Sequence, residues 1–439
     1  MAVDSSAKPA KKIVLVVGLP DYETAFRVTE GHRKRGKKYR YAYIYNGQVP
    51  AEEKTVADLF DIAISCDLAS DEAIVAALGP YKEELIAITV PRFEKYIPWL
   101  QRMIPFVPQL HTPTVESLTW ATNKIEMRKH FVAYNPRVSP KFLVVENASN
   151  RTIKTIQQEI GLPVVIKPSG LAASLLVSIA FHAEELEQSL KRIFRKIRVQ
   201  WRQVEGRGEP QVLVEQFMDG TMYSLDAYVV ASGKIYFCPL VYVKTGREIG
   251  FDDFFGYERL TPTDLSKEST QQAREVSADA IRALALLNTT CHVELMKTEQ
   301  GWKVIELGPR AGGFRDFMYR FSYGIDHYAN DIAIRAGKQP KIPRKLQNHV
   351  AVFEIFAKQE GLISNITGSK KIRELQSFHH IENNKKIGDK ALYAKHGGSS
   401  ILNLFLFNKD RSELLADIRR MEQMLKIETE PRAQKKEKP

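Results

Sequence analysis

The chain has 439 residues, of which 44% are hydrophobic and 26% charged, a composition that supports two to four domains with packed cores. Its apolar runs are strand-sized, its first twelve residues lack the apolar stretch of a signal peptide, and its three cysteines are far apart; we therefore expect a cytoplasmic protein with no membrane span, disulfide framework or zinc site. The net charge of +12 lies in two basic clusters, residues 32–40 and 191–202, which we interpret as solvated faces; a nucleic-acid surface is the less favoured alternative, and attraction of anionic substrates is a third.

The first hundred residues alternate short apolar runs with helix-like stretches. The apolar runs predict strands at residues 13–17, 41–45, 61–65 and 85–90, and the stretches between them predict helices at 22–34, 71–78 and 93–103. Buried strands separated by helices are typical of a doubly wound parallel sheet. The turn after the first strand, at residues 18–21, lacks the G-x-G-x-x-G pattern, so we expect no dinucleotide site there.

From about residue 117 the pattern changes, and helices are followed by pairs of strands. We predict helices at 117–133, 152–160, 183–197, 271–287 and 411–425, and strands at 140–145, 164–167, 175–180, 212–217, 223–230, 234–238, 292–297 and 303–307. The Lys-rich last residues, 431–439, are expected to be disordered.

Two of these strands end in charged residues. In VVIKPSG (164–170), Lys167 ends an apolar run and would present its ammonium at the sheet edge, where lysine binds phosphate as a point charge. A strand-end lysine that merely reaches solvent is the commoner explanation. In VLVEQFMDG (212–220), Glu215 ends a second strand before a turn. Neither motif is specific in isolation.

A predicted hairpin carries a more specific arrangement. HVELM (292–296) and VIELGPRAGG (304–313) flank a turn, and side chains alternate between the two faces of each strand. His292 and Glu294 therefore share one face, and Glu306 shares a face with Gly308 and Arg310. If these faces coincide, a divalent cation would relieve the repulsion between the two carboxylates. We favour this over an exposed glutamate pair, because each glutamate lies in an apolar run where an unpaired charge is costly.

Taken in this order, the four segments resemble the ATP-grasp superfamily, specifically its carboxylate–amine ligases, which include amino-acid ligases and relatives of biotin carboxylase. The resemblance covers residues from about 13 to 427, and residues 361–366 and 386–389 look like the family's G-x-I and K-x-G-D stretches. It implies an α/β protein with a doubly wound pre-ATP-grasp sheet and an α+β grasp domain. The implied boundaries are a tail at 1–12, the pre-ATP-grasp domain at 13–116, the ATP-grasp domain at 117–340 with its small subdomain at about 128–215, a C-terminal lid-like segment at 341–427 and a disordered tail at 428–439.

The resemblance also implies ATP as a cofactor, together with Mg²⁺ or Mn²⁺, and roles for individual residues. Glu294 and Glu306 match magnesium ligands, while Arg310 matches the arginine that stabilises the acyl phosphate. The implied nucleotide contacts are Arg128 and Lys167 on the phosphates, Ser169 and Ser174 in the phosphate-covering loop, and Glu215, Gln216, Phe217 and Met218 at the hinge that reads adenine. Two positions differ from the family pattern: Gly308 replaces the usual asparagine, and Met222 replaces a common ribose-binding acid.

The implied reaction joins a small-molecule carboxylate to an amine through an acyl phosphate, with release of ADP and phosphate; Arg310 and Lys167 would be its catalytic residues. Arg247 and Arg315 are candidates for gripping the substrate carboxylate, and residues 250–256 either close over the site or pack in the core. We expect no nucleic acid and no membrane as partners, and a homodimer is the default oligomer. The alternative is an ATP-binding regulatory or scaffold protein that kept the fold and lost turnover.

Overall fold

The computed structural model describes residues 12–34, 36, 39–168, 177–203, 211–251 and 253–430. The tails predicted at 1–11 and 431–439 lie outside these residues. Among the described residues, no helix is both long and apolar enough to cross a membrane.

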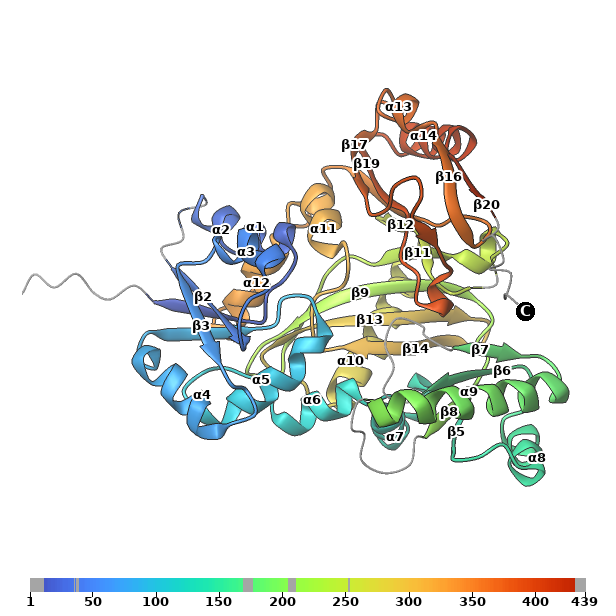
Figure 1. Cartoon of the computed structure of the whole chain (residues 1–439), viewed down its shortest axis with the longest axis horizontal. Coiled ribbons are helices and arrows are strands. Elements are labelled where there is room, and N and C mark those ends of the chain that lie inside the picture. Colours follow the sequence, from blue (N-terminus) through green and yellow to red (C-terminus); the bar gives the residue numbers. More distant parts are fainter. Residues whose placement is uncertain are drawn as a thin grey trace, which may run out of the picture.

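The N-terminal domain is built on a parallel sheet, as predicted (Figure 1). Its strands run in the order β3 (Ile62–Cys66), β2 (Arg40–Asn46), β1 (Ile13–Val17) and β4 (Leu85–Thr89). Its helices are α1 (Tyr22–Val28), α2 (Glu30–Arg33), α3 (Lys54–Ala57), α4 (Asp71–Leu78) and α5 (Ile97–Met103). Successive residues of β1 point to opposite faces, so Leu15 packs in a core with α4 and α5 while Val16 packs in a second core on the other face. The sheet is therefore buried on both sides.

The helix predicted at 117–133 is two helices, α6 (Val115–Thr122) and α7 (Lys124–Tyr134). Asn123 separates them, because its backbone is extended and its side-chain oxygen accepts hydrogen bonds from the backbone N–H groups of Ile125 and Glu126. Met127 and Phe131 of α7 are buried in the core of the central sheet. The small subdomain, expected from about residue 128, therefore begins later.

That small subdomain is an antiparallel sheet with two helices (Figure 1). Its strand order is β5 (Phe142–Val145), β8 (Val212–Gln216), β6 (Val164–Pro168) and β7 (Ser178–Ala180), and its helices are α8 (Asn150–Glu159) and α9 (Ala183–Gln203). One apolar stripe of α9 covers the sheet, with Leu186, Leu190, Ile193 and Ile197 all buried. The basic residues described on its other side, Lys191, Arg192, Arg195 and Lys196, are exposed. These members of the cluster are therefore accessible to solvent.

A nine-stranded sheet forms the centre of the described chain. Its order is β14 (Gly301–Gly308), β13 (Thr289–Thr298), β9 (Thr221–Val229), β11 (Val241–Thr245), β12 (Gly256–Thr261), β15 (His349–Ile355), β19 (Leu402–Asn408) and β17 (Phe378–Asn383), with β10 (Ile235–Phe237) paired to β9. Helices α7 and α10 (Lys267–Ala283) pack against the β13–β14 end of this sheet. The predicted hairpin is the β13–β14 pair.

The C-terminal segment, expected to be lid-like at 341–427, is continuous with the central sheet. Strand β15 pairs with β12, and β19 pairs with β15, because these strands are apolar on both faces and bury fully only inside a sheet. A small sheet of β16 (Gly361–Thr367), β18 (Lys390–Ala391) and β20 (Lys426–Glu430) lies beside it with α13 (Ser369–Ile372) and α14 (Arg411–Met424). Residues 428–430, predicted to be in the tail, belong to β20 and pair with β16.

Two helices connect the N-terminal domain to the central sheet: α11 (Arg315–Tyr323) and α12 (His327–Arg335) (Figure 1). Arg27 Nε lies 2.9 Å from Asp316 Oδ2 in a buried ion pair. Thr89 Oγ1 donates to Asp331 Oδ2 across 2.5 Å. These contacts hold α11 and α12 against the N-terminal domain.

Candidate active site

A cavity of about 770 Å³ is lined by residues of the N-terminal domain, the small sheet and the central sheet. Of the residues predicted to form a site, those that line it are Lys167, Glu215, Gln216, Phe217, Met218, Glu294, Glu306 and Arg310. Ser169 and Ser174 lie in a stretch outside the described residues. The structure therefore brings together side chains from segments more than a hundred residues apart in sequence.

The two predicted metal ligands face each other. Glu294 on β13 and Glu306 on β14 are direct register partners in the antiparallel hairpin, and both line the cavity. Side chains of opposed residues lie on the same face of a sheet. The geometric expectation that these carboxylates converge is therefore met.

A lysine that the sequence analysis did not single out completes this group. Lys124 is the first residue of α7, and its Nζ lies 2.7 Å from Glu306 Oε1. Burial opposes its charged form, but Glu306 and then Glu94 and Glu294 raise the pKa of the Lys124 ammonium. The sequence signal that could have identified Lys124 is its place directly after Asn123 at the start of a helix. The N-cap residue fixes the direction in which the next side chain leaves the helix.

Arg128 is placed elsewhere than predicted, one helical turn beyond Lys124. Its guanidinium is buried under the cavity, where Nη1 donates to Val304 O across 3.1 Å, Nη2 donates to Ile305 O across 2.6 Å, and Nε pairs with Glu215. Three of its N–H groups thus donate to protein oxygens, and Arg128 supports the floor of the cavity. Lys124, and not Arg128, lines the cavity itself.

Glu215, predicted to lie at the hinge that reads adenine, pairs with two cationic side chains. Its carboxylate is buried between Arg128 and Lys167, whose Nζ lies 2.5 Å from Oε2. Burial alone would raise the pKa of Glu215, but Arg128 and Lys167 outweigh it and lower the pKa to about 2. The carboxylate thus orients Lys167, while the backbone of Gln216 to Met218 remains at the cavity wall.

One end of the cavity is apolar. Met222 on β9, Met296 on β13 and Ile305 on β14 line it, and Phe217 and Phe181 lie with ring centroids 6.2 Å apart. The Arg247 guanidinium lies 5.5–5.9 Å from the rings of Phe181, Phe217 and Phe254. Such a slot suits a flat aromatic base.

The segment 250–256 divides between the two predicted alternatives. Phe254 lines the cavity. Phe251 and Phe255 pack edge to face with each other, and Phe255 packs on Phe356 at 4.1 Å. Arg315, proposed as a substrate grip, is buried behind the cavity, where its Nη2 donates to Ser224 Oγ across 2.6 Å.

Arg310 lies beside a carboxylate from the N-terminal domain. Its Nη2 is 3.4 Å from Glu94 Oε2, and Glu94 begins the 3₁₀ turn Glu94–Tyr96 after β4. Burial raises the pKa of Glu94, an effect that Arg310 opposes and Glu306 reinforces. A Cβ added at Gly308 would lie 3.5 Å from Glu94 Oε2 and 3.6 Å from Arg310 Cζ, so it would fit there in ordinary van der Waals contact with both side chains.

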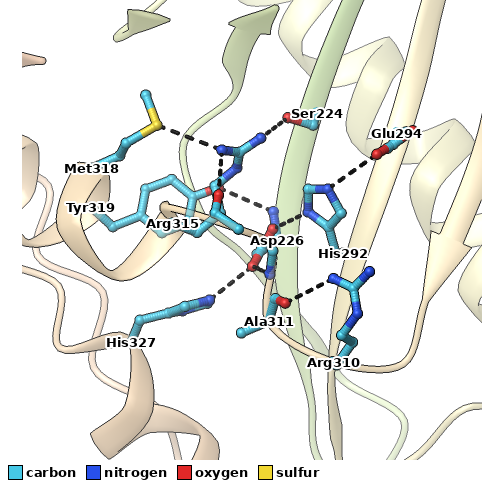
Figure 2. Close-up of polar contacts among 12 residues, drawn as sticks. Ser224, Asp226, His292, Glu294, Arg310, Ala311, Arg315, Met318, Tyr319 and His327 are labelled. Atoms are coloured by element: carbon cyan, nitrogen blue, oxygen red, sulfur yellow. Dashed lines mark hydrogen bonds and ion pairs between the residues drawn. The ribbon is translucent and has the colours of Figure 1, made fainter. Parts of the chain in front are cut away.

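His292, left without a role by the sequence, belongs to a buried network (Figure 2). Its Nδ1 lies 2.6 Å from Asp226 Oδ1, and its Nε2 lies 3.6 Å from Glu294 Oε1. The second oxygen of Asp226 is 2.8 Å from His327 Nε2 and accepts a hydrogen bond from the Gly312 N–H, also across 2.8 Å. Burial disfavours the charged imidazole, but Asp226 and Glu294 raise the pKa of His292.

The carboxylate pair fits a magnesium ion that is shared with phosphates. In the described chain, no group of three or more His, Cys, Asp or Glu residues could hold a metal by itself. Glu294 and Glu306 are nevertheless oxygen ligands on one cavity wall. Lys124 Nζ lies 2.7 Å from Glu306 Oε1, which shows that this wall attracts positive charge. Mg²⁺ is commonly bound by one or two carboxylates together with substrate phosphates and water.

The fold matches solved structures over nearly its whole length. An L-amino acid ligase from Bacillus licheniformis superposes with a TM-score of 0.72 at 17% sequence identity, covering 96% of this chain and 99% of that one. Residues 160–316, which include most of the cavity wall, match the model of the ATP-grasp domain. The chain therefore contains a segment that matches an ATP-grasp domain, and it shares its overall fold with the solved L-amino acid ligase.

The curated relatives are matched over only part of their own lengths. An uncharacterized protein of Sinorhizobium fredii is 25% identical over 296 residues, 66% of this chain and 56% of that protein. Human carnosine synthase 1 is 25% identical over 238 residues, 53% of this chain and 28% of that protein. The chain therefore spans about half of the first relative and just over a quarter of the second.

Proposed function

We propose that this ATP-grasp protein is a ligase that couples a small-molecule carboxylate to an amine at the expense of ATP. The convergence of Lys124, Lys167 and Arg310 with the Glu294–Glu306 pair in one cavity, next to an apolar slot, carries the proposal. Cations suit a triphosphate, paired carboxylates suit its metal, and the slot suits its base. The names of the relatives, among them an L-amino acid ligase and carnosine synthase 1, agree with this class.

The nucleotide would lie with its base between Phe181 and Met296 and its phosphates toward Lys167 and Lys124. Glu215 holds Lys167 in place, so its ammonium is oriented before the nucleotide arrives. Mg²⁺ held by Glu294 and Glu306 would neutralise charge on the β- and γ-phosphates. Lys124, now paired with Glu306, is close enough to exchange that carboxylate for a phosphate oxygen.

The substrate carboxylate would attack the γ-phosphorus in line, with ADP as the leaving group, to give an acyl phosphate. The amine then attacks the acyl carbon, inorganic phosphate leaves and the amine proton passes to solvent, so an amide bond forms. Arg310 lies at the cavity wall where it can stabilise the oxyanion of this step. Glu94, beside Arg310, is placed to accept hydrogen bonds from the amine.

A substrate panel tests the proposal. Purified protein with Mg-ATP and pairs of carboxylates and amines is expected to release ADP and phosphate with coupled product detected by mass spectrometry. Glu306→Gln and Lys167→Ala should each lower turnover at least 100-fold without changing the circular dichroism spectrum. Lys191→Ala on the exposed side of α9 is the control and should turn over like wild type.

Three outcomes would contradict the proposal. Release of AMP and pyrophosphate would exclude the acyl-phosphate route. Unchanged turnover in Glu306→Gln would exclude the carboxylate pair as the metal site. Tight ATP binding without turnover for any substrate pair would instead favour a regulatory or scaffold protein, the alternative that Gly308 and Met222 suggest.

A further inference from the structure

Asp226 is a fully buried carboxylate that the proposed reaction does not use. It lies on β9, behind the cavity wall, at 0% exposure. Burial would raise the pKa of this carboxyl, but His292 and His327 lower it well below its usual range, so Asp226 is ionised. An ionised carboxylate only accepts hydrogen bonds, and so it fixes the protons of its neighbours on Nδ1 of His292 and Nε2 of His327.

This carboxylate connects two parts of the candidate site that are not adjacent in sequence (Figure 2). Through His292 it reaches Glu294, because the two side chains leave the same face of β13 and His292 Nε2 lies 3.6 Å from Glu294 Oε1. Through the Gly312 N–H it reaches the loop that carries Arg310. The metal-facing glutamate and the arginine loop are therefore attached to one buried anchor.

The packing around this anchor leaves little room for independent movement. A Cβ on Gly312 would lie 2.3 Å from His292 Nδ1 and 2.8 Å from Arg315 Cγ, so the loop backbone is pressed against the imidazole. Tyr319 Oη accepts a hydrogen bond from the backbone N–H of Asp226 across 3.2 Å. The position of the imidazole and the position of the loop thus depend on each other.

We propose that Asp226 is a positioning residue that, through His292 and Gly312, sets the orientation of Glu294 toward the metal and so determines the metal affinity of the cavity. The inference rests on the proposed function, in which Glu294 is a metal ligand. Groups that orient a ligand carboxylate or imidazole typically change metal affinity by roughly 10- to 100-fold when they are removed. Asp226 contacts neither substrate nor metal itself.

The test measures metal binding directly. Mn²⁺ is titrated into the protein in the presence of a non-hydrolysable ATP analogue, and free Mn²⁺ is followed by electron paramagnetic resonance. Asp226→Asn keeps the shape of the side chain but removes its charge and replaces one acceptor by a donor. We expect its Mn²⁺ dissociation constant to rise about 10- to 100-fold, with binding of the analogue in the absence of metal within twofold of wild type.

Tyr228→Phe is the matched control, since Tyr228 is buried in the same region and its hydroxyl lies 2.5 Å from His327 Nδ1, one step beyond Asp226. It should lower the melting temperature yet leave the Mn²⁺ dissociation constant within threefold of wild type. Gly312→Ala perturbs the same network from the loop side, and it should also raise the Mn²⁺ dissociation constant. It keeps the test available if Asp226→Asn does not fold.

Several results would overturn the inference. One is that Asp226→Asn or Gly312→Ala binds Mn²⁺ as tightly as wild type does, and another is that Tyr228→Phe weakens Mn²⁺ binding as much as Asp226→Asn does. In either case Asp226 only supports the fold, and the proposed function stands. If wild-type protein binds no Mn²⁺ with the nucleotide analogue, the proposed function fails and this inference fails with it.

Discussion

The substitution Glu215→Gln is expected to destabilise the protein strongly, although it changes only one atom of a side chain. Glu215 lies between Arg128 and Lys167, and all three are largely buried. The pKa of Glu215 falls from its ordinary value of 4.5 to about 2, and this difference corresponds to roughly 3 kcal/mol of stability at neutral pH. Because the folded-state pKa is the lower one, this contribution is present above pH 4.5 and disappears as the pH falls toward 2.

The assay is urea unfolding at pH 7, followed by circular dichroism, of wild type, Glu215→Gln, Arg128→Met and the double variant. Each single variant leaves a buried charge without its partner and should lose about 3 kcal/mol. The double variant should lose at least about 1 kcal/mol less than the sum of the two, since it removes both members of one pair.

An exposed ion pair on α7, the helix that carries Arg128, is a control for the effect of burial. Lys129 and Glu126 form a pair of similar length, 2.8 Å, but Lys129 is 58% exposed. Glu126→Gln should therefore change stability by less than about 0.5 kcal/mol. Additive losses in the double variant, or a Glu215→Gln loss as small as that of Glu126→Gln, would refute the assignment of a buried, coupled triad.

Two further predictions follow from Lys124 and Glu258. Lys124→Met should weaken binding of a non-hydrolysable Mg-ATP analogue by roughly 10- to 100-fold in titration calorimetry, as expected for loss of one charged phosphate contact, whereas Lys129→Met should bind normally. Burial raises the pKa of Glu258 on β12 to about 7, so its ionisation on going from pH 5 to pH 8 destabilises the folded state. Glu258→Gln should raise the melting temperature at pH 8 and change it far less at pH 5; an equal change at both values would contradict the ionisation of a buried carboxyl.

The parallel N-terminal sheet and the β13–β14 hairpin were predictable because each depends on a local pattern. Alternation along β13 places His292 and Glu294 on one face, and the turn is enough to pair the two strands. The pairing of glutamate with glutamate also needs a register shift. Counted back from the turn, Glu294 would oppose Ile305, and the shift between Glu294 and Leu295 places it opposite Glu306 instead. Neither alternation nor the length of the turn predicts that shift.

Other parts of the site depend on how deeply each side chain lies in the folded protein, and a periodic sequence pattern does not predict that. Lys124 and Arg128 are four residues apart and leave the same side of α7, yet one reaches the cavity and the other lies beneath it. Only the packing of α7 on the central sheet decides between them. Glu94 comes from a different domain, about two hundred residues from Arg310, so no local signal announces their meeting.

The pairing of the C-terminal segment with the central sheet could not be predicted for a related reason. Strand β15 reads as an ordinary apolar run, and nothing in its own sequence identifies β12 as its partner. Pairings between distant strands are fixed by tertiary packing.

The pairing of Lys124 with Glu306 has a consequence for the protein before any nucleotide arrives. The ammonium already satisfies one of the two facing carboxylates, so the fold carries its own counterion at the place where a metal would later bind. If a metal binds there as proposed, a chelator should remove it without unfolding the chain, unlike small domains whose folding requires the metal. Binding of the metal and the nucleotide would then exchange one positive charge for another at Glu306, and the lysine released from Glu306 would pair with the incoming phosphates.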